Sequence, residues 1–315
     1  RHSGDDDVRA FAAALLESPA GTALIESLAG NSPFLFETAL ANPHAFQFLL
    51  TEGPDRAFPD ILARLAADAV ANAVAVADSE PELSWLRRTL RAVKAQASLT
   101  VAIADIANVW PVEKVTAALS MLADRAVALS VAHLLKAAVA RGEIEAVDPA
   151  DPARDSGFIV LALGKLGGQD LNYSSDIDLF LLFDEEKVRY RGRQSAQQFF
   201  VRLSHNMVAM LQERTENGYV FRTDLRLRPD PGATPPVVSV MAAEIYYETM
   251  GQNWERAAMI KARPIAGDLK AGEQFVRSLR PFLWRKNLDF AAIRDIHSIK
   301  RQINAHHGGA EIRVA

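Results

Sequence analysis

The spacing of apolar residues changes once along the chain, across a polar and proline-bearing connector at 145–156. Before the connector, apolar residues recur at intervals of three and four, as Val115, Leu119 and Leu122 do, and this period is typical of amphipathic helices. After it, short apolar runs such as 158–163 have the length and the branched side chains of buried strands. A chain with both patterns must combine a helical bundle with a sheet. The sequence therefore predicts a mixed, helix-rich α+β fold.

Local signals place the elements more closely. Asn or Ser stands directly before Pro33 and before Pro43, and such pairs are typical of helix starts. A second apolar run at 177–183 predicts another strand, and the alternating pattern over 219–228 predicts a third. We expect three consecutive parts: a helical N-terminal domain over 1–144, a sheet domain over 145–270, and the start of a helical C-terminal region over 271–315.

Composition excludes several classes of protein. Cysteine is absent, which excludes a disulfide scaffold, a thiolate zinc site and a cysteine nucleophile. Residues 1–150 carry a net charge of −7 and residues 151–315 a net charge of +3. A chain that is acidic overall binds nucleic acid poorly, because binding requires a concentrated positive field. We therefore expect no nucleic-acid partner, whereas the basic second part suits a small polyanion such as a nucleotide.

The sequence also bears on location. No uninterrupted apolar run approaches the ~18 residues that suggest a membrane span, and the polar, acidic start is unlike a signal peptide. Together with the absence of cysteine, this favours a cytoplasmic protein with no membrane partner. The first residue is Arg1 rather than methionine, so we expect the chain to be part of a longer protein.

The stretch between the first two predicted strands carries the strongest functional signal. Lys165 and the pair Gly167 and Gly168 follow the first strand; glycine lets backbone N–H groups approach an anion, and lysine adds positive charge. Asp176 and Asp178 are one residue apart, so a strand places both carboxylates on one face. Neighbouring carboxylates repel unless a cation lies between them, and oxygen ligands suit Mg²⁺ or Mn²⁺. Each pattern by itself is equally compatible with a solvated turn.

A third aspartate, Asp224, falls in the alternating pattern of the third predicted strand. On an extended strand, Arg222, Arg226 and Arg228 would share its face. Two interpretations follow. The four side chains form a surface ladder of ion pairs, or the arginines form a phosphate clamp beside a metal-binding carboxylate, because the guanidinium fork pairs with phosphate oxygens.

This arrangement resembles nucleotidyltransferases of the DNA-polymerase-β type, in which a glycine turn, an Asp-x-Asp pair and a third aspartate hold two metal ions. Five segments together are similar to bacterial glutamine synthetase adenylyltransferase/adenylyl-removing enzymes: Gly164-Lys165-Leu166-Gly167-Gly168, 171–179, 224–229, 251–256 and 261–263. The leader at 31–35 also resembles the helical segment ahead of that family's first nucleotidyltransferase half, so the resemblance covers nearly the whole chain. There are two departures. Asp170 stands where the family usually has glutamate, and the chain stops soon after 306–309, before a Gly-rich stretch with Arg and Glu.

The resemblance implies the task of that first half. The task is phosphorolysis of adenylyl-tyrosine on glutamine synthetase, in which inorganic phosphate takes up AMP to give ADP and the unmodified enzyme. It implies two Mg²⁺ or Mn²⁺ ions held by Asp176, Asp178 and Asp224, which are also the catalytic residues. It implies adenylylated glutamine synthetase as partner and, through the full-length protein, a nitrogen-signalling PII protein. The nucleotide and phosphate would be held by Lys165, Gly167, Gly168, Ser174, Ser175, Arg226, Arg228 and Arg263.

Other interpretations remain open at this stage. The same fold transfers an adenylyl group from ATP to a protein tyrosine, or a nucleotide to RNA or a small molecule. An RNA-directed version should have a broad basic surface, and the net charge of −7 over 1–150 argues against it. A non-catalytic docking module that senses nucleotides is a further alternative. The three aspartates argue against it, because a sensor does not need a complete metal-binding set.

Overall fold

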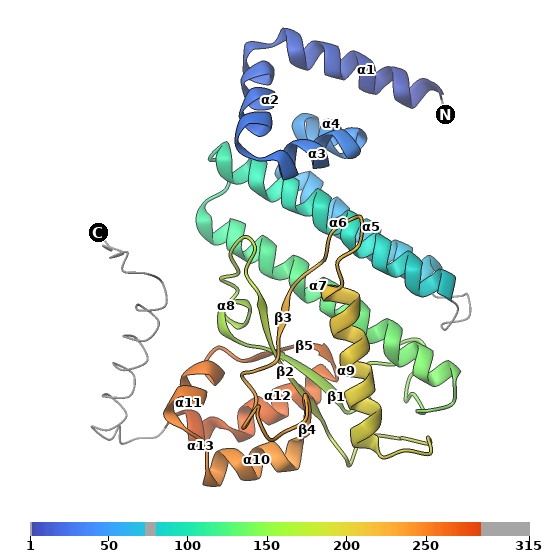
Figure 1. Ribbon diagram of the computed structural model, residues 1–315, viewed down its shortest axis with the longest axis vertical. Coiled ribbons are helices and arrows are strands. Elements are labelled where there is room, and N and C mark those ends of the chain that lie inside the picture. Colours follow the sequence, from blue (N-terminus) through green and yellow to red (C-terminus); the bar gives the residue numbers. More distant parts are fainter. Residues whose placement is uncertain (1, 73–79, 285–315) are drawn as a thin grey trace. The chain divides into compact units, whose positions relative to one another are not determined.

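The computed structural model describes residues 2–72 and 80–284 (Figure 1). Most of the predicted C-terminal region, 285–315, lies outside the described residues. Within them the fold is α+β, with many helices and a five-stranded mixed sheet. The predicted fold class is confirmed.

The chain forms two compact units that interleave along the sequence. The first consists of residues 1–129, 169–174 and 210–221, and the second of 130–168, 175–209 and the residues from 222 onward. Helix α7 (Val112–Ala140) runs through the boundary without interruption. The boundaries expected at 144 and 270 stay a prediction.

Helices make up most of the first unit. The predicted starts at Pro33 and Pro43 are confirmed, and Ser32 caps the helix behind it by accepting the N–H of Leu35 at 3.4 Å. Phe46 and Leu99 belong to a buried apolar cluster that these helices share. Before α7 the helices are α1 (His2–Glu17), α2 (Pro19–Asn31), α3 (Pro33–Ala41), α4 (Pro43–Glu52), α5 (Pro54–Asn72) and α6 (Glu80–Ile106).

Helix α7 is long and apolar. Among the described residues it has the length and composition to cross a membrane, and the strongly bent pair α1–α2 would qualify only as one broken span. The stripe of Val115, Leu119 and Leu122 is buried inside the protein, as the sequence predicts. Such burial is typical of a core helix.

The sheet lies in the second unit. Its strands are β1 (Phe158–Ala162), β2 (Ile177–Phe183), β3 (Thr223–Asp224), β4 (Val237–Ser239) and β5 (Arg263–Gly267). The order is β3-β2-β1-β5, and β4 also pairs with β2. Strand β1 is antiparallel to β2 and β5, whereas β3 and β4 are parallel to β2. All five residues of β1 and six of the seven of β2 are buried, so the apolar runs form the middle of the sheet.

Both faces of the sheet are covered. On one face Phe200 of α9 (Ala196–Gln212) stacks on Phe158 and Phe183, with ring centroids 5.2 and 5.3 Å apart. On the other face, Phe180 contacts Tyr247 and Phe275. These two side chains come from a group of helices: α10 (Val240–Thr249), α11 (Asn253–Met259), α12 (Leu269–Ser278) and α13 (Arg280–Leu283). The sheet is thereby held rigidly between helices.

The prediction of a strand over 219–228 is wrong for most of that range, because β3 contains only Thr223 and Asp224. Val220 and Phe221 are not in a strand: both of their N–H groups donate to the carbonyl of Leu211 at the end of α9. Beyond Asp224, the N–H of Arg226 donates to the Asp224 carboxylate at 2.8 Å. When an aspartate carboxylate accepts the backbone N–H of the residue two positions later, the chain forms a turn, and this turn ends the strand.

Candidate active site

The predicted carboxylates come together at the junction of β2 and β3. Asp178 and Asp224 are register partners on these parallel strands, so their side chains leave the same face from backbones about 4.8 Å apart. Asp176 comes directly before β2 and two residues before Asp178, which places it on that face as well. The structure therefore brings Asp178 and Asp224 together and places Asp176 near enough for its charge to act on Asp178.

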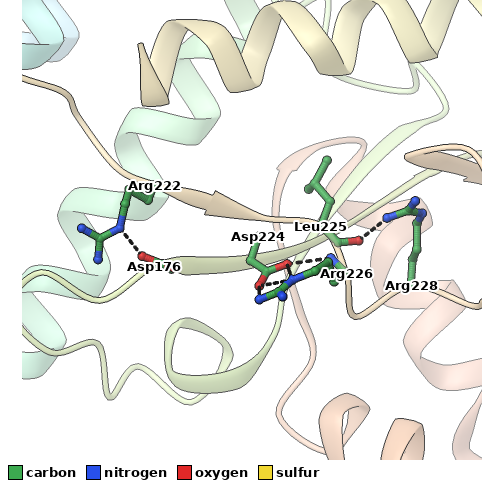
Figure 2. Close-up of polar contacts among 6 residues, drawn as sticks. All are labelled: Asp176, Arg222, Asp224, Leu225, Arg226 and Arg228. Carbon is green, nitrogen blue, oxygen red and sulfur yellow. Dashed lines mark hydrogen bonds and ion pairs between the residues drawn. The ribbon is translucent and has the colours of Figure 1, made fainter. Parts of the chain in front are cut away.

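The environments of the three carboxylates differ. Asp178 is half-buried, and burial raises its pKa, with further contributions from the charges of Asp224 and Asp176. Arg226 lowers the pKa of Asp224 through hydrogen bonds from its guanidinium at 2.9 and 2.5 Å. Asp176 accepts the Nε–H of Arg222 at 2.5 Å. Figure 2 shows these two Arg–Asp pairs side by side.

The observed hydrogen bonds show which groups the arginines of this segment contact. With β3 ending at Asp224, the predicted common face of Arg222, Arg226 and Arg228 does not extend along a strand. Arg228 stands apart from the Asp224–Arg226 pair (Figure 2) and donates to the carbonyls of Leu225 and Thr234, at 2.7 and 3.0 Å. In this arrangement Arg228 holds the turn that follows β3, whereas Arg222 and Arg226 are the arginines that pair with the carboxylates.

The glycines after β1 lie in a short helical turn. Gly164 to Gly167 form the single helical turn α8, in which the N–H groups of Gly167 and Gly168 donate to the carbonyls of Leu163 and Gly164. These two N–H groups are therefore hydrogen-bonded within the turn, and their contact with an anion stays a prediction. A Cβ on Gly167 would lie 2.4 Å from the carbonyl oxygen of Lys261, so glycine is needed there for close packing.

Gly164 is a site residue whose role the sequence reasoning missed. Its φ is +54°, and an added Cβ would lie 2.3 Å from Oδ2 of Asp178. Only glycine combines this backbone conformation with room for the carboxylate. Its position directly after the predicted strand, three residues before the glycine pair, was the signal that could have shown it.

The remaining predicted residues surround α8 and β2. Lys165 is exposed on α8, and its charge acts on Asp178 by lowering that residue's pKa against the larger effect of burial. Arg263 donates to the carbonyls of Leu166 and Gly167 at 2.9 and 3.2 Å and so fastens α8 to β5. Ser174 has a φ of +53° and belongs to the first unit. Ser175 is half-buried in the second.

The donor set suits a divalent cation. In the described part of the chain, no three His, Asp or Glu side chains are placed so that they could hold a metal ion, and arginines pair with Asp176 and Asp224. Yet Asp178 and Asp224 are register partners, and burial, followed by the charges of Asp224 and Asp176, raises the pKa of Asp178. Oxygen-only donors that repel one another in this way fit Mg²⁺ or Mn²⁺.

Residues 22–278 match the family model described as glutamate-ammonia ligase adenylyltransferase. The chain belongs to this family. The resemblance expected from the sequence is thus confirmed, and the glycine turn, the three aspartates and the arginines all lie within the residues matched.

Curated relatives carry the name bifunctional glutamine synthetase adenylyltransferase/adenylyl-removing enzyme. The chain is 47% identical to that of Rhizobium meliloti (strain 1021) over 289 residues, covering 90% of this chain and 28% of the relative. It is 46% identical to that of Bradyrhizobium diazoefficiens over 301 residues, covering 96% and 29%. The chain thus spans less than a third of the length of the family members that it matches.

Proposed function

We propose that this chain carries out the adenylyl-removing reaction on glutamine synthetase. Inorganic phosphate attacks the phosphorus of adenylyl-tyrosine, the bond to the tyrosine oxygen breaks, and ADP and the unmodified tyrosine leave. The observation that carries the proposal is the register of Asp178 with Asp224, with the charge of Asp176 acting on Asp178, in a chain of this family. We further propose a cytoplasmic location and, through a longer protein, contact with a nitrogen-signalling PII protein.

The chemistry makes different demands on the two oxygens. Phosphate is already an anion at neutral pH and needs no strong base to attack. The leaving tyrosine oxygen has a parent pKa of about 10 and needs its developing charge stabilised. Two divalent ions held by the three aspartates would supply this by binding the attacking and leaving oxygens.

The chain's own cations do the remaining work. Lys165 and Arg226 are exposed and stand beside the carboxylates. Arg226 is exposed and pairs with Asp224, so it can turn to a phosphate oxygen when a cation neutralises that carboxylate. We assign Arg228 and Arg263 to holding the turn after β3 and α8, and we keep Ser174 and Ser175 as hydroxyl donors to the substrate.

The test is phosphate-dependent release of ADP from adenylylated glutamine synthetase. Asp176→Asn, Asp178→Asn and Asp224→Asn should each lower turnover by about 100-fold or more, because each removes charge at the site where the metals and the reacting phosphate meet. Asp151→Asn, an exposed aspartate in the connector, is the matched control and should keep full turnover. Wild-type turnover in the Asp178→Asn protein would reject the proposal.

Transfer of AMP from ATP to glutamine synthetase is the second candidate, favoured by the name that the family carries. It demands a base, because the attacking tyrosine hydroxyl must lose its proton. The same preparation incubated with ATP and unmodified glutamine synthetase separates the two. Incorporation of AMP without phosphate-dependent ADP release would replace the first proposal with this one.

A further inference from the structure

The two chain segments that lead into the carboxylates belong to the first of the two units, which is mostly helical and is named the helical unit. Residues 169–174 end two positions before Asp176, and residues 210–221 end three positions before Asp224. Both aspartates lie in the other unit, together with the sheet. The helical unit therefore holds the chain just ahead of each of them.

A buried arginine of α6 holds the second of these segments. Arg91 is only 2% exposed. Its guanidinium donates to the carbonyls of Gly218 and Arg87, both at 2.9 Å, and to those of Glu213 and Met210. The last two carbonyls lie at the C-terminal end of α9, where a cation is favourable. Burying a cation is costly unless its donors are satisfied, and here three of the four carbonyls lie within 210–218.

The path from Arg91 to the carboxylates is short. Gly218 is four residues ahead of Arg222, and Lys94, one helical turn beyond Arg91, lies over the rings of Tyr219 and Phe221 at 5.1 and 5.9 Å. The carbonyl of Arg222 then accepts the N–H of Ile177 at 2.9 Å. This bond begins the pairing of β2 with β3, on which the register of Asp178 with Asp224 depends.

The same helical unit holds the segment ahead of Asp176. The N–H of Leu171 donates to the buried hydroxyl of Ser120 at 3.2 Å. The hydroxyl of Tyr173 donates to Asp105 at 3.1 Å. Ser120 lies on α7, and Asp105 lies in the last turn of α6. Neither contact involves a group that touches substrate.

We propose that Arg91 is a positioning residue for the carboxylate site, assisted by Lys94 and by the Tyr173–Asp105 contact. By fixing the chain just ahead of Arg222 and Asp176, it sets the pairing that brings Asp178 and Asp224 together. The kinetic test of this inference rests on the proposed function, whereas its hydrogen-exchange test depends only on the backbone pairing of β2 with β3.

The experiment compares Arg91→Met with Arg88→Met. Arg88 lies three residues before Arg91 on α6, is exposed, and donates to the Ser84 hydroxyl. Arg91→Met should lower kcat for phosphorolysis by about 10- to 100-fold, because small displacements of catalytic groups cost this much. KM should change by less than about twofold, since no substrate contact is lost. Arg88→Met should match the wild type.

Amide hydrogen exchange supplies the readout that a general loss of stability would not produce. Exchange at Ile177 should become faster in Arg91→Met, while exchange at Val160, in the middle of β1, should stay slow. Equal acceleration at both amides, or unchanged kcat, would overturn the proposal. If the wild type releases no ADP, the proposed function fails, and the exchange at Ile177 still decides whether Arg91 positions the strand pair.

Two milder variants cover a failure of Arg91→Met to fold. Lys94→Met removes the contact with the ring of Tyr219, in the segment ahead of Asp224. Tyr173→Phe removes the hydrogen bond to Asp105, in the segment ahead of Asp176. Both variants leave Arg91 in place. Each should lower kcat by about threefold or more, with Val160 still protected. Unchanged kcat in both proteins would overturn the proposal.

Discussion

At Gly164 the backbone has a φ of +54°, and an added Cβ would meet the Asp178 carboxylate at 2.3 Å. The carboxylate occupies the space that a side chain would fill, and its half-buried position raises its pKa. The position of the Asp178 carboxylate, and with it the raised pKa of Asp178, therefore depends on glycine at position 164.

Gly164→Ala should lose phosphorolysis and also lose stability, because the methyl group displaces the Asp178 carboxylate. Gly142→Ala is the matched control: its φ is +69°, and nothing lies within 4 Å of the added Cβ. Both variants should lose about 1–2 kcal/mol of unfolding free energy through the left-handed backbone, measured by urea denaturation. Only Gly164→Ala should lose turnover. Equal activity of the two proteins would contradict the argument.

A second residue gives a pH dependence. Glu255 is 1% exposed at the start of α11 and accepts the N–H of Gln252 at 2.8 Å and the hydroxyl of Tyr246 at 3.1 Å. Burial raises its pKa above the ordinary 4.5, although both hydrogen bonds act in the opposite direction. A carboxyl whose pKa rises on folding penalises the folded state once it ionises.

Glu255→Gln should therefore gain stability relative to the wild type as the pH rises. Below the ordinary pKa of 4.5 both side chains are neutral and the penalty is absent; it develops as the pH passes from 4.5 through the raised pKa. The measurement is the difference in Tm between variant and wild type at acid and at mildly alkaline pH. Glu248→Gln, on the exposed side of α10, controls for the loss of one charge. A difference that stays constant with pH would contradict the assigned cause.

At the scale of elements, the turn after β3 separates two neighbouring arginines. Arg228 is half-buried and donates to the carbonyls of Leu225, Pro231 and Thr234. Arg226 is mostly exposed and pairs with Asp224. The first therefore holds backbone, and the second is available to a ligand.

Arg228→Gln should lower the unfolding free energy by about 1–3 kcal/mol, because several carbonyls lose their donor. Arg226→Gln should leave stability nearly unchanged, since exposed ion pairs contribute little, but should lower turnover in ADP release. Denaturant titration and the phosphorolysis assay on the same preparations compare the two. The reverse pattern would assign the phosphate-binding role to Arg228 instead.

The fate of the predicted strands shows what local sequence can determine. The runs at 158–163 and 177–183 predict β1 and β2, and the prolines at 33 and 43 predict two helix starts, because each signal depends on neighbouring residues. The alternation over 219–228 fails because its apolar residues are buried for different reasons. The N–H groups of Val220 and Phe221 bond to the end of α9. Leu227 instead packs against the apolar cluster that contains Phe180, Tyr247 and Phe275.

The candidate site divides in the same way. Asp176 and Asp178 share a face because of strand periodicity, which is local. Their meeting with Asp224 requires the register of two strands distant in sequence, which the family resemblance implied. The direction of Arg228 and the N–H groups of Gly167 and Gly168 depend on turns that close only in three dimensions.

On the scale of the whole molecule, the interleaving of the two units limits how the chain can be divided. Leu171, Val220 and Phe221 are all buried, and they belong to the helical unit although they lie beyond the connector in sequence. Arg91 and Ser120 bond to the segments that carry these residues. A piece that starts after the connector would expose them.

Cleavage in the connector should therefore not separate the chain. A protease site placed between the exposed residues Ala150 and Asp151 would produce two pieces, and we expect them to elute together in size-exclusion chromatography without denaturant. The contacts of residues 169–174 and 210–221 with α6 and α7 should hold them, because several buried apolar side chains and backbone hydrogen bonds act together. Residues 145–315 expressed alone should bind a hydrophobic dye more strongly than the cleaved pair. Separation of the two pieces on the column would show instead that the chain divides at the connector into independent domains.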